Sequence, residues 1–188
     1  MYLRAKNNHE ITILHATEED WEGAMALAWR TFSRYDAPDY TKEGCESFIE
    51  FISSETLHKA FMLGRYRLLV AKDGEKIIGI AGFREQNHIS LLFVDAAYHG
   101  CGVGRALMGC IEDYLFERDV LPLDNEDEKI LDVLYERADG HYITVFSAPG
   151  AEGFYKTLGY ERIGEEGIER GITYIPMKKT EKKTVSII

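Results

Sequence analysis

The fold is decided by one glycine-rich stretch, Tyr98-His99-Gly100-Cys101-Gly102-Val103-Gly104-Arg105. An apolar run at residues 89–94 precedes it, and apolar residues at helical spacing follow it from Val103 to Leu115. Glycine lets the backbone come close to a ligand because it has no Cβ. The first turn of a following helix presents free N–H groups and the positive end of its dipole to an anion. The stretch therefore predicts a strand, a phosphate-binding loop and a helix, in that order.

Two common phosphate-binding loops do not fit these residues. A Walker A loop needs Gly-Lys-Ser/Thr at the helix start, whereas Gly104 is followed by Arg105. A dinucleotide fingerprint needs a third small residue where Leu107 stands. The pattern that fits is Gln/Arg-x-x-Gly-x-Gly/Ala over residues 99–104, and it resembles the pyrophosphate loop of the GCN5-related N-acetyltransferases (GNAT). The departure is His99, where that family usually has Gln or Arg.

A second stretch strengthens the resemblance. After a strand-like run at residues 141–146, the segment 149–160 reads PGAEGFYKTLGY. It is similar to the family's second signature, a helix that carries Phe-Tyr and ends in Leu-Gly-aromatic. The resemblance implies an α/β fold with a mixed, mostly antiparallel central sheet flanked by helices, which is the acyl-CoA N-acyltransferase fold. It also implies direct transfer of an acetyl group from acetyl-CoA to a primary amine in a ternary complex.

The rest of the chain supplies the elements of one domain over residues 11–178. A short strand at 11–14 precedes a helix capped by Thr17, and a second helix begins after Thr41. Strands on either side of Asp73-Gly74 form a hairpin, and a further strand covers residues 88–94.

Two segments fit this domain less well. Residues 119–139 are interpreted as an insertion with an extra short helix, either a cap on the sheet or an acceptor-binding lid. Residues 179–188 form a C-terminal tail, basic and then apolar, that could fray, dock on the core or serve a neighbouring molecule.

Composition limits the classes of partner. The 188 residues are 45% hydrophobic and suit one globular domain. A net charge of −10 argues against nucleic acid and is compatible with an amine acceptor, and no apolar stretch has the length of a membrane span. The three cysteines have no metal spacing, so we expect a reduced, cytoplasmic setting and no metal. A homodimer remains open.

The resemblance assigns cofactor contacts to the strand end and the loop. The strand should diverge from its neighbour and pair with the pantetheine arm, with an N–H at about Phe93 or Val94 on the thioester carbonyl. Loop amides would receive the pyrophosphate, and Arg105 either adds a charged contact or points to solvent. The predicted cofactor-binding residues are Leu92, Phe93, Val94, His99, Gly100, Cys101, Gly102, Val103, Gly104, Arg105 and Ala106.

Catalysis is less well defined than cofactor binding. Tyr155 stands at the tyrosine of the Phe-Tyr motif, so the resemblance makes it the general acid for the leaving thiolate. The strand before the loop has no carboxylate, which leaves Glu85 and His88 as candidates for the general base, or no protein group at all. Tyr35 and Asp36 are the predicted acceptor-binding residues.

Other functions use the same loop. The absent strand carboxylate permits a non-catalytic acyl-CoA sensor or partner-binding module. A nucleotide or phosphosugar binder is a second alternative, and a dinucleotide-dependent redox enzyme fits least because the fingerprint residue is missing.

Overall fold

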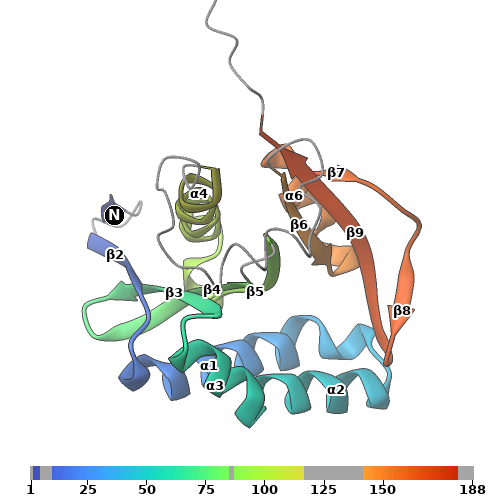
Figure 1. Ribbon diagram of the computed structural model, residues 1–188, viewed down its shortest axis with the longest axis horizontal. Helices are drawn as coiled ribbons and strands as arrows, with labels where there is room; N and C mark the ends of the chain where they lie inside the picture. Colours follow the sequence, from blue (N-terminus) through green and yellow to red (C-terminus); the bar gives the residue numbers. More distant parts are fainter. Residues whose placement is uncertain (1, 5–9, 85–86, 117–141, 182–188) are drawn as a thin grey trace, which may run out of the picture.

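The structure is a computed structural model that describes residues 2–4, 10–84, 87–116 and 142–181. Its centre is a sheet of order β1-β2-β3-β4-β5-β6-β9-β7, and β8 pairs with β9 off this path (Figure 1). The strands are β1 (Tyr2–Arg4), β2 (Glu10–His15), β3 (Tyr66–Asp73), β4 (Lys76–Arg84), β5 (His88–Val94), β6 (Tyr142–Ser147), β7 (Glu161–Arg162), β8 (Gly167–Glu169) and β9 (Ile172–Thr180). Among the described strands only β5 and β6 pair in parallel. The predicted mixed, mostly antiparallel sheet is confirmed.

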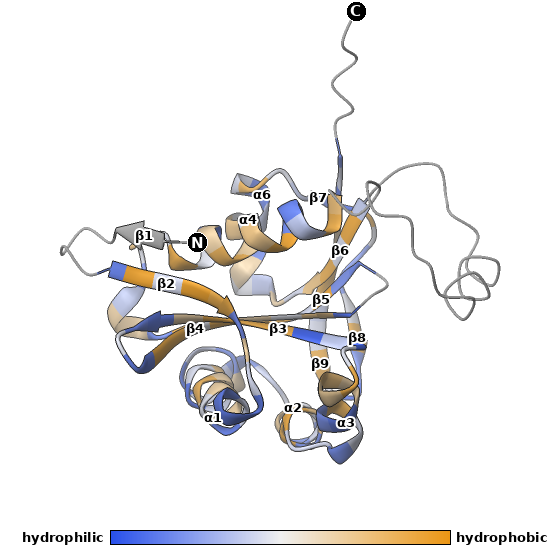
Figure 2. Cartoon of the chain, turned by 60° about the vertical axis from the view of Figure 1, so that its left-hand side comes forward, coloured by the Kyte–Doolittle hydropathy of each residue, from blue (hydrophilic) through white to orange (hydrophobic). Residues whose placement is uncertain are grey.

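Helices cover both faces of the sheet. Figure 2 shows α1 (Glu18–Tyr35), α2 (Lys42–Ile52) and α3 (Glu55–Met62) on one side, with α4 (Val103–Phe116) and α6 (Glu152–Thr157) on the other. Each side has its own apolar core, one built around α1 and α2 and the other around α4. Three short 3-10 helices complete the described elements: η1 (Ala37–Asp39), η2 (Ala96–Tyr98) and η4 (Pro149–Ala151).

The helix after the glycine loop lies directly on the sheet. A Cβ at Gly79 of β4 would stand 2.9 Å from a Val103 side-chain carbon and 3.1 Å from one of Leu107. Glycine at this position therefore allows the first turns of α4 to approach β4, and this contact fixes the direction in which the loop opens.

Several local predictions are confirmed. Thr17 caps α1 in a capping box with Asp20, and Gly74 has φ +59° in the two-residue turn of the β3–β4 hairpin. Strand β5 spans the predicted residues 88–94. The sequence prediction did not include α3, which is only eight residues long and begins after the N-cap Ser54.

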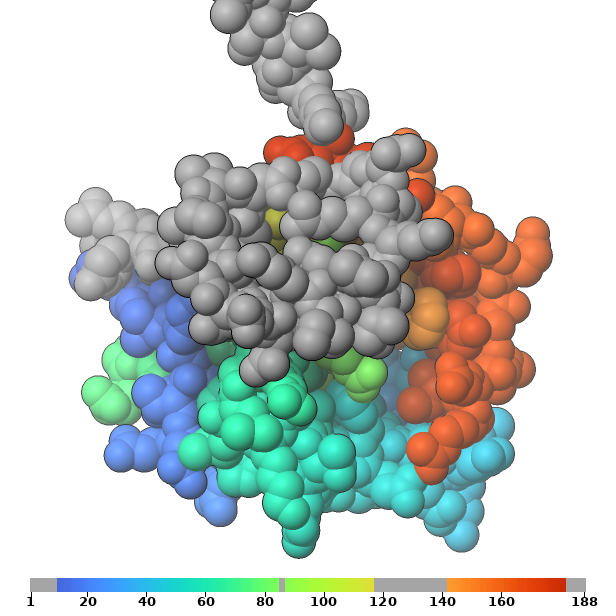
Figure 3. All heavy atoms as spheres, viewed as in Figure 1, coloured from blue at the N-terminus to red at the C-terminus, as the bar shows by residue number. Residues whose placement is uncertain are grey.

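The last two strands are fastened to α2. A Cβ at Gly44 would lie 2.2 Å from the carbonyl oxygen of Gly171, in the turn between β8 and β9. Thr41 Oγ1 donates to that same oxygen at 3.3 Å, and Ser47 Oγ donates to the Arg170 oxygen at 2.9 Å. In Figure 3 the orange and red atoms of this hairpin lie against those of α2, in light blue.

Some predicted segments lie outside the described residues. These are the insertion at 119–139 and residues 182–188 of the tail, while Lys179 and Thr180 belong to β9. None of the described helices is long and apolar enough to cross a membrane.

Candidate active site

The two parallel strands separate beside the glycine loop. Pairing between β5 and β6 is limited to His88 with Thr144 and Ile89 with Val145, although both strands continue beyond it. Within the described residues, the second half of β5 therefore has no strand on its β6 side. This is the divergence that the family resemblance implies, and it exposes backbone groups to an extended ligand.

The register with β4 decides which backbone groups of β5 face the gap. The Asp95 N–H donates to the Ile78 oxygen at 2.8 Å, and Phe93 lies opposite Ile80 in the same register. Because pairs alternate in an antiparallel ladder, Phe93 also directs its N–H to β4. The N–H and C=O groups of Leu92 and Val94 consequently face the gap. Phe93 and Val94 are the two residues predicted to contact the thioester carbonyl. Only Val94 directs its N–H to the gap, and the N–H of Leu92 faces the gap as well.

The loop itself presents a set of free amides. Gly100 and Gly102 have φ values of +72° and +86°, which residues other than glycine seldom adopt. Within the described part of the chain, five of the six N–H groups from residue 100 to residue 105 have no backbone acceptor. They belong to Gly100, Gly102, Val103, Gly104 and Arg105. They surround the positive end of α4, an arrangement that suits a pyrophosphate.

Two of the predicted contact residues do not offer a free amide. The Cys101 N–H donates to the Tyr98 oxygen at 3.2 Å, and the Ala106 N–H donates to the Gly102 oxygen at 3.0 Å. The Cys101 thiol lies 3.8 Å from the His99 oxygen. Any contact of Cys101 or Ala106 with a ligand would therefore come from the side chain.

The His99 side chain is directed at the end of the strand. Its Nε2 lies 2.8 Å from the Val94 oxygen, and its ring centroid lies 5.3 Å from that of Tyr35 at the end of α1. Since a carbonyl oxygen can only accept, Nε2 carries the proton in this contact. His99 thus links the loop, β5 and α1, which a comparison of loop motifs could not reveal.

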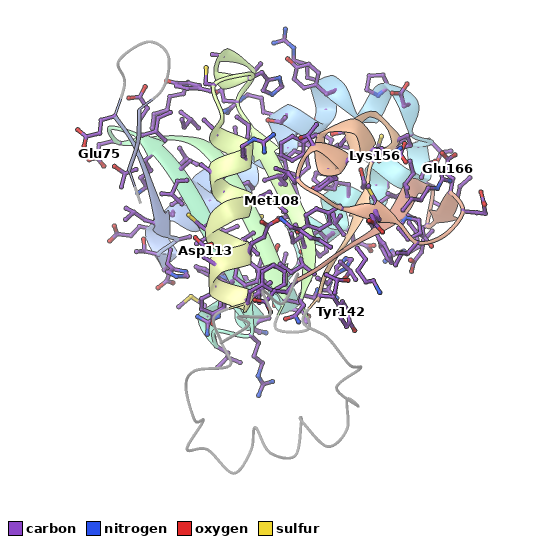
Figure 4. All side chains as sticks on the ribbon, turned by 90° about the horizontal axis from the view of Figure 1, so that it is seen from above. Glu75, Met108, Asp113, Tyr142, Lys156 and Glu166 are labelled. Atoms are coloured by element: carbon purple, nitrogen blue, oxygen red, sulfur yellow. The ribbon has the colours of Figure 1, made fainter. Side chains whose placement is uncertain are left out.

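Arg105 and Gly104 join the loop to α6. Arg105 Nη2 donates to Thr157 Oγ1 at 3.2 Å, so this side chain bridges two helices and is neither aimed at the loop nor free. A Cβ at Gly104 would stand 3.4 Å from the Phe154 ring. Figure 4 shows α4, with Met108 and Asp113 labelled, beside α6, with Lys156 labelled. The two signature segments, far apart in sequence, therefore form one side of the site.

The Tyr155 side chain is packed within this side of the site. Its side chain is 5% exposed and packs edge-to-face between Phe154 and Tyr160, with ring centroids 5.3 and 5.6 Å away. Its hydroxyl has no hydrogen-bond partner among the described residues. Burial, and then the nearby Asp36 carboxylate, raise the pKa of Tyr155 well above its usual value. The hydroxyl is consequently protonated at neutral pH and able to donate.

Asp36 stands at the C-terminal end of α1, close enough to Tyr155 to affect its pKa. Burial and the neighbouring Asp39 raise the pKa of Asp36 to about 6. Burial and these two carboxylates also raise the pKa of Tyr40 to about 12. Tyr35 is the exposed neighbour that touches His99. The structure therefore brings the predicted acceptor residues Tyr35 and Asp36 to the same end of the site as Tyr155 and Val94.

The two predicted base candidates are placed differently. His88 lies at the closed end of the gap, where β5 and β6 still pair, and its Nδ1 is 2.9 Å from Thr144 Oγ1. Burial, followed by the charge of Arg84, lowers the pKa of His88, so the ring is neutral at pH 7. Glu85 lies outside the described residues. In the part of the chain that the structure describes, no group of three or more His, Cys, Asp or Glu could hold a metal ion.

The comparisons with known proteins agree with this geometry. A family model described as an acetyltransferase (GNAT) domain matches residues 36–124 and 128–181. A GCN5-related N-acetyltransferase from Rhodopseudomonas palustris superposes with a TM-score of 0.69 at 21% identity, covering 90% of this chain and 95% of that one. PaiA N-acetyltransferase from Thermoplasma acidophilum, solved in complex with coenzyme A, superposes with a TM-score of 0.67 at 18% identity. The match covers 91% of this chain and 99% of that one.

A ribosomal-protein-alanine N-acetyltransferase from Brucella melitensis gives a TM-score of 0.58 at 19% identity, over 90% of this chain and 99% of that one. At these identities the solved structures show the fold, whereas the family model covers well over half of the chain and shows the family. No curated protein matched the sequence significantly.

Proposed function

Because the chain belongs to the GNAT acetyltransferase family, we propose that it transfers an acetyl group from acetyl-CoA to a primary amine of a small molecule or peptide. The observation that carries this proposal is the continuity of two binding surfaces. The unpaired edge of β5 leads directly into the five free amides at the start of α4. One extended ligand with a pyrophosphate at one end and amide groups along its length fits both.

The residues present suit acetyl-CoA. The amides of Gly100, Gly102, Val103, Gly104 and Arg105 would hold the pyrophosphate, and nothing lies within 4 Å of the Cβ positions of Gly100 and Gly102. The backbone groups of Leu92 and Val94 would pair with the pantetheine amides as a further strand would. Acetyl-CoA supplies the activated acetyl thioester.

Leu92, Val94 and Tyr155 have distinct roles in the transfer. An N–H of Leu92 or Val94 would donate to the thioester carbonyl and stabilise the charge that develops there, a contribution of about 3 kcal/mol in comparable sites. Tyr155, buried and protonated, would donate its hydroxyl proton to the departing sulfur.

An amine acceptor is supported by the sign of the charge at the acceptor end. Asp36 and Asp39 lie there, and the chain carries a net charge of −10. The three similar structures described above are named as N-acetyltransferases, and one of them is a ribosomal-protein-alanine N-acetyltransferase. Both small-molecule and peptide amines therefore belong in the first substrate panel.

Calorimetric titration with acetyl-CoA tests the proposal. We expect one site, displacement by CoA and no competition from ATP, followed by thiol release with at least one primary amine from a panel of diamines, aromatic amines and alanyl peptides. ATP binding without acetyl-CoA binding would instead indicate a nucleotide-binding module. Acetyl-CoA binding without thiol release from any amine would indicate an acyl-CoA sensor.

A further inference from the structure

The C-terminal end of α1 is held against the reactive end of β5. Tyr35 packs on His99, whose Nε2 meets the Val94 oxygen. One helical turn earlier, Arg30 pairs with Asp95 at 3.3 Å, directly after β5. These contacts hold the end of α1 at the strand end whose N–H groups face the gap, and Asp36 directly follows Tyr35 there.

Asp36 has no partner for its charge in the part of the chain that the structure describes. Its carboxylate makes no ion pair or hydrogen bond with any residue that the structure describes, although it is half-buried. The Asp39 carboxylate of η1 helps to raise the pKa of Asp36. The Asp36 charge in turn helps to raise the pKa values of Tyr40 and of Tyr155 in α6. The nearby cations on its own helix are engaged elsewhere: Arg30 pairs with Asp95, and Arg34 lies over the Tyr35 ring at 5.4 Å.

A second polar group near Asp36, the Tyr155 hydroxyl, also has no hydrogen-bond partner among the described residues. The side chain that carries it is 5% exposed. Unlike the Tyr160 hydroxyl, the Tyr155 hydroxyl is not fully enclosed by protein, so a ligand can reach it. A bound cation that can both pair with a carboxylate and approach the tyrosine would account for both groups.

We infer that Asp36 binds the acceptor as an ammonium cation and takes from it the proton that must leave before nitrogen can attack. This inference rests on the proposed acetyl transfer and assigns the general base that the β5 sequence lacks. The substrate class is therefore a primary ammonium group, and neutral acceptors such as alcohols are poor substrates because they cannot pair with Asp36.

The proton and bond changes balance with the groups present. The ammonium ion gives one proton to the Asp36 carboxylate, and the neutral nitrogen then forms a bond to the acetyl carbon. The carbon–sulfur bond breaks, and its electron pair takes the proton of the Tyr155 hydroxyl. The second nitrogen proton restores the Tyr155 hydroxyl, and Asp36 releases its proton to water. The net products are the acetylated amine, CoA and one proton.

The decisive experiment is the pH profile of kcat/KM for an active amine, compared between wild type, Asp36→Asn and Asp36→Glu. We expect wild-type kcat/KM to rise with pH through the pKa of Asp36, about 6, and then level off. Asp36→Asn should lose this rise and lower kcat by about 10²- to 10⁴-fold, the usual contribution of a general base. Asp36→Glu should recover part of the rate together with the rise. Acetyl-CoA affinity should not change in either variant.

Glu46→Gln is the matched control, because it makes the same chemical change at a side chain that is 64% exposed on α2 and paired with Lys42. It should behave as wild type. If Asp36→Asn kept the wild-type kcat and pH profile, the role of Asp36 would be overturned while the proposed function would stand. Loss of the pH-dependent rise in His88→Gln would assign the base to His88 instead. Failure of wild type to bind acetyl-CoA would overturn the proposed function and this assignment with it.

Discussion

His99 Nε2 donates a hydrogen bond to the carbonyl oxygen of Val94 across 2.8 Å, which ties the first residue of the glycine motif to the last residue of β5. The same ring packs on Tyr35 at the end of α1. One side chain therefore sets the positions of the strand edge, the loop and the acceptor end relative to one another.

We expect His99→Ala to weaken the connection between β5, the glycine loop and the end of α1. The loss of one hydrogen bond and one aromatic contact should lower the free energy of unfolding by about 1–2 kcal/mol. The KM for acetyl-CoA should rise because the Val94 backbone is no longer held. Urea unfolding and initial rates measure the two effects. His99→Gln retains an N–H donor and should stay close to wild type, and equal damage in both variants would argue against the hydrogen bond.

Gly102→Ala tests the loop amides. At φ +86° a Cβ costs about 1–2 kcal/mol or forces the loop to move, and either outcome displaces the N–H groups meant for the pyrophosphate. Acetyl-CoA affinity, measured by calorimetry, should fall by about tenfold or more. Gly109→Ala is the control, in the helix that follows the loop, since nothing lies within 4 Å of its Cβ position. It should leave affinity unchanged and stabilise α4 slightly, by up to about 1 kcal/mol.

Tyr155→Phe removes the proposed proton donor for the leaving sulfur and keeps the ring between Phe154 and Tyr160. We expect kcat to fall by about 10²- to 10⁴-fold, with acetyl-CoA affinity retained. Tyr160→Phe makes the same change at the neighbouring ring, 5.6 Å away, and should keep near-normal kcat. Similar rates for Tyr155→Phe and wild type would show that the sulfur is protonated by another group.

The raised pKa of Asp36 also predicts a pH-dependent cost in stability. Below about pH 3 the carboxyl is protonated in the folded and unfolded chains, so it contributes no difference. Between about pH 4 and the folded-state pKa of about 6, the unfolded chain ionises first, and the folded state loses stability as pH rises. Asp36→Asn removes this cost.

Unfolding of wild type and Asp36→Asn should therefore be compared at two pH values. We expect the variant to be more stable by about 1 kcal/mol at pH 8, after allowance for solvent screening of a half-buried group, and nearly equal to wild type at about pH 3. A variant that is less stable than wild type at both pH values would mean that Asp36 makes a stabilising contact. This combination of higher stability and lower activity is typical of active-site substitutions.

Gly44→Ala tests the attachment of the β8–β9 hairpin to α2. The added Cβ would fall 2.2 Å from the Gly171 oxygen, so the hairpin must shift. We expect a loss of about 1–3 kcal/mol in the free energy of unfolding. Gly153→Ala, where nothing lies within 4 Å of the Cβ position, should cause no such loss. Equal stability of the two variants would show that the hairpin moves without cost.

Local sequence signals were sufficient for the elements whose causes are local. The strand, glycine loop and helix from His88 to Phe116 follow from an apolar run, residues that allow positive φ and helical spacing. Thr17 and Gly159 mark helix ends because capping depends on the few residues around them. The short helix α3 was missed because eight residues carry too little periodicity to distinguish a helix from a loop.

By itself the sequence determined the GNAT resemblance, the glycine loop and the place of Tyr155 in the second signature, since each is encoded in contiguous residues. Tertiary structure alone decided which N–H groups of β5 face the gap, because that depends on its register with β4. It also decided that Asp36, 119 residues before Tyr155 in the chain, lies close enough to raise the pKa of that tyrosine and pairs with no cation among the described residues. A carboxylate's burial and partners are set by segments distant in sequence, and these set its pKa and its chemistry.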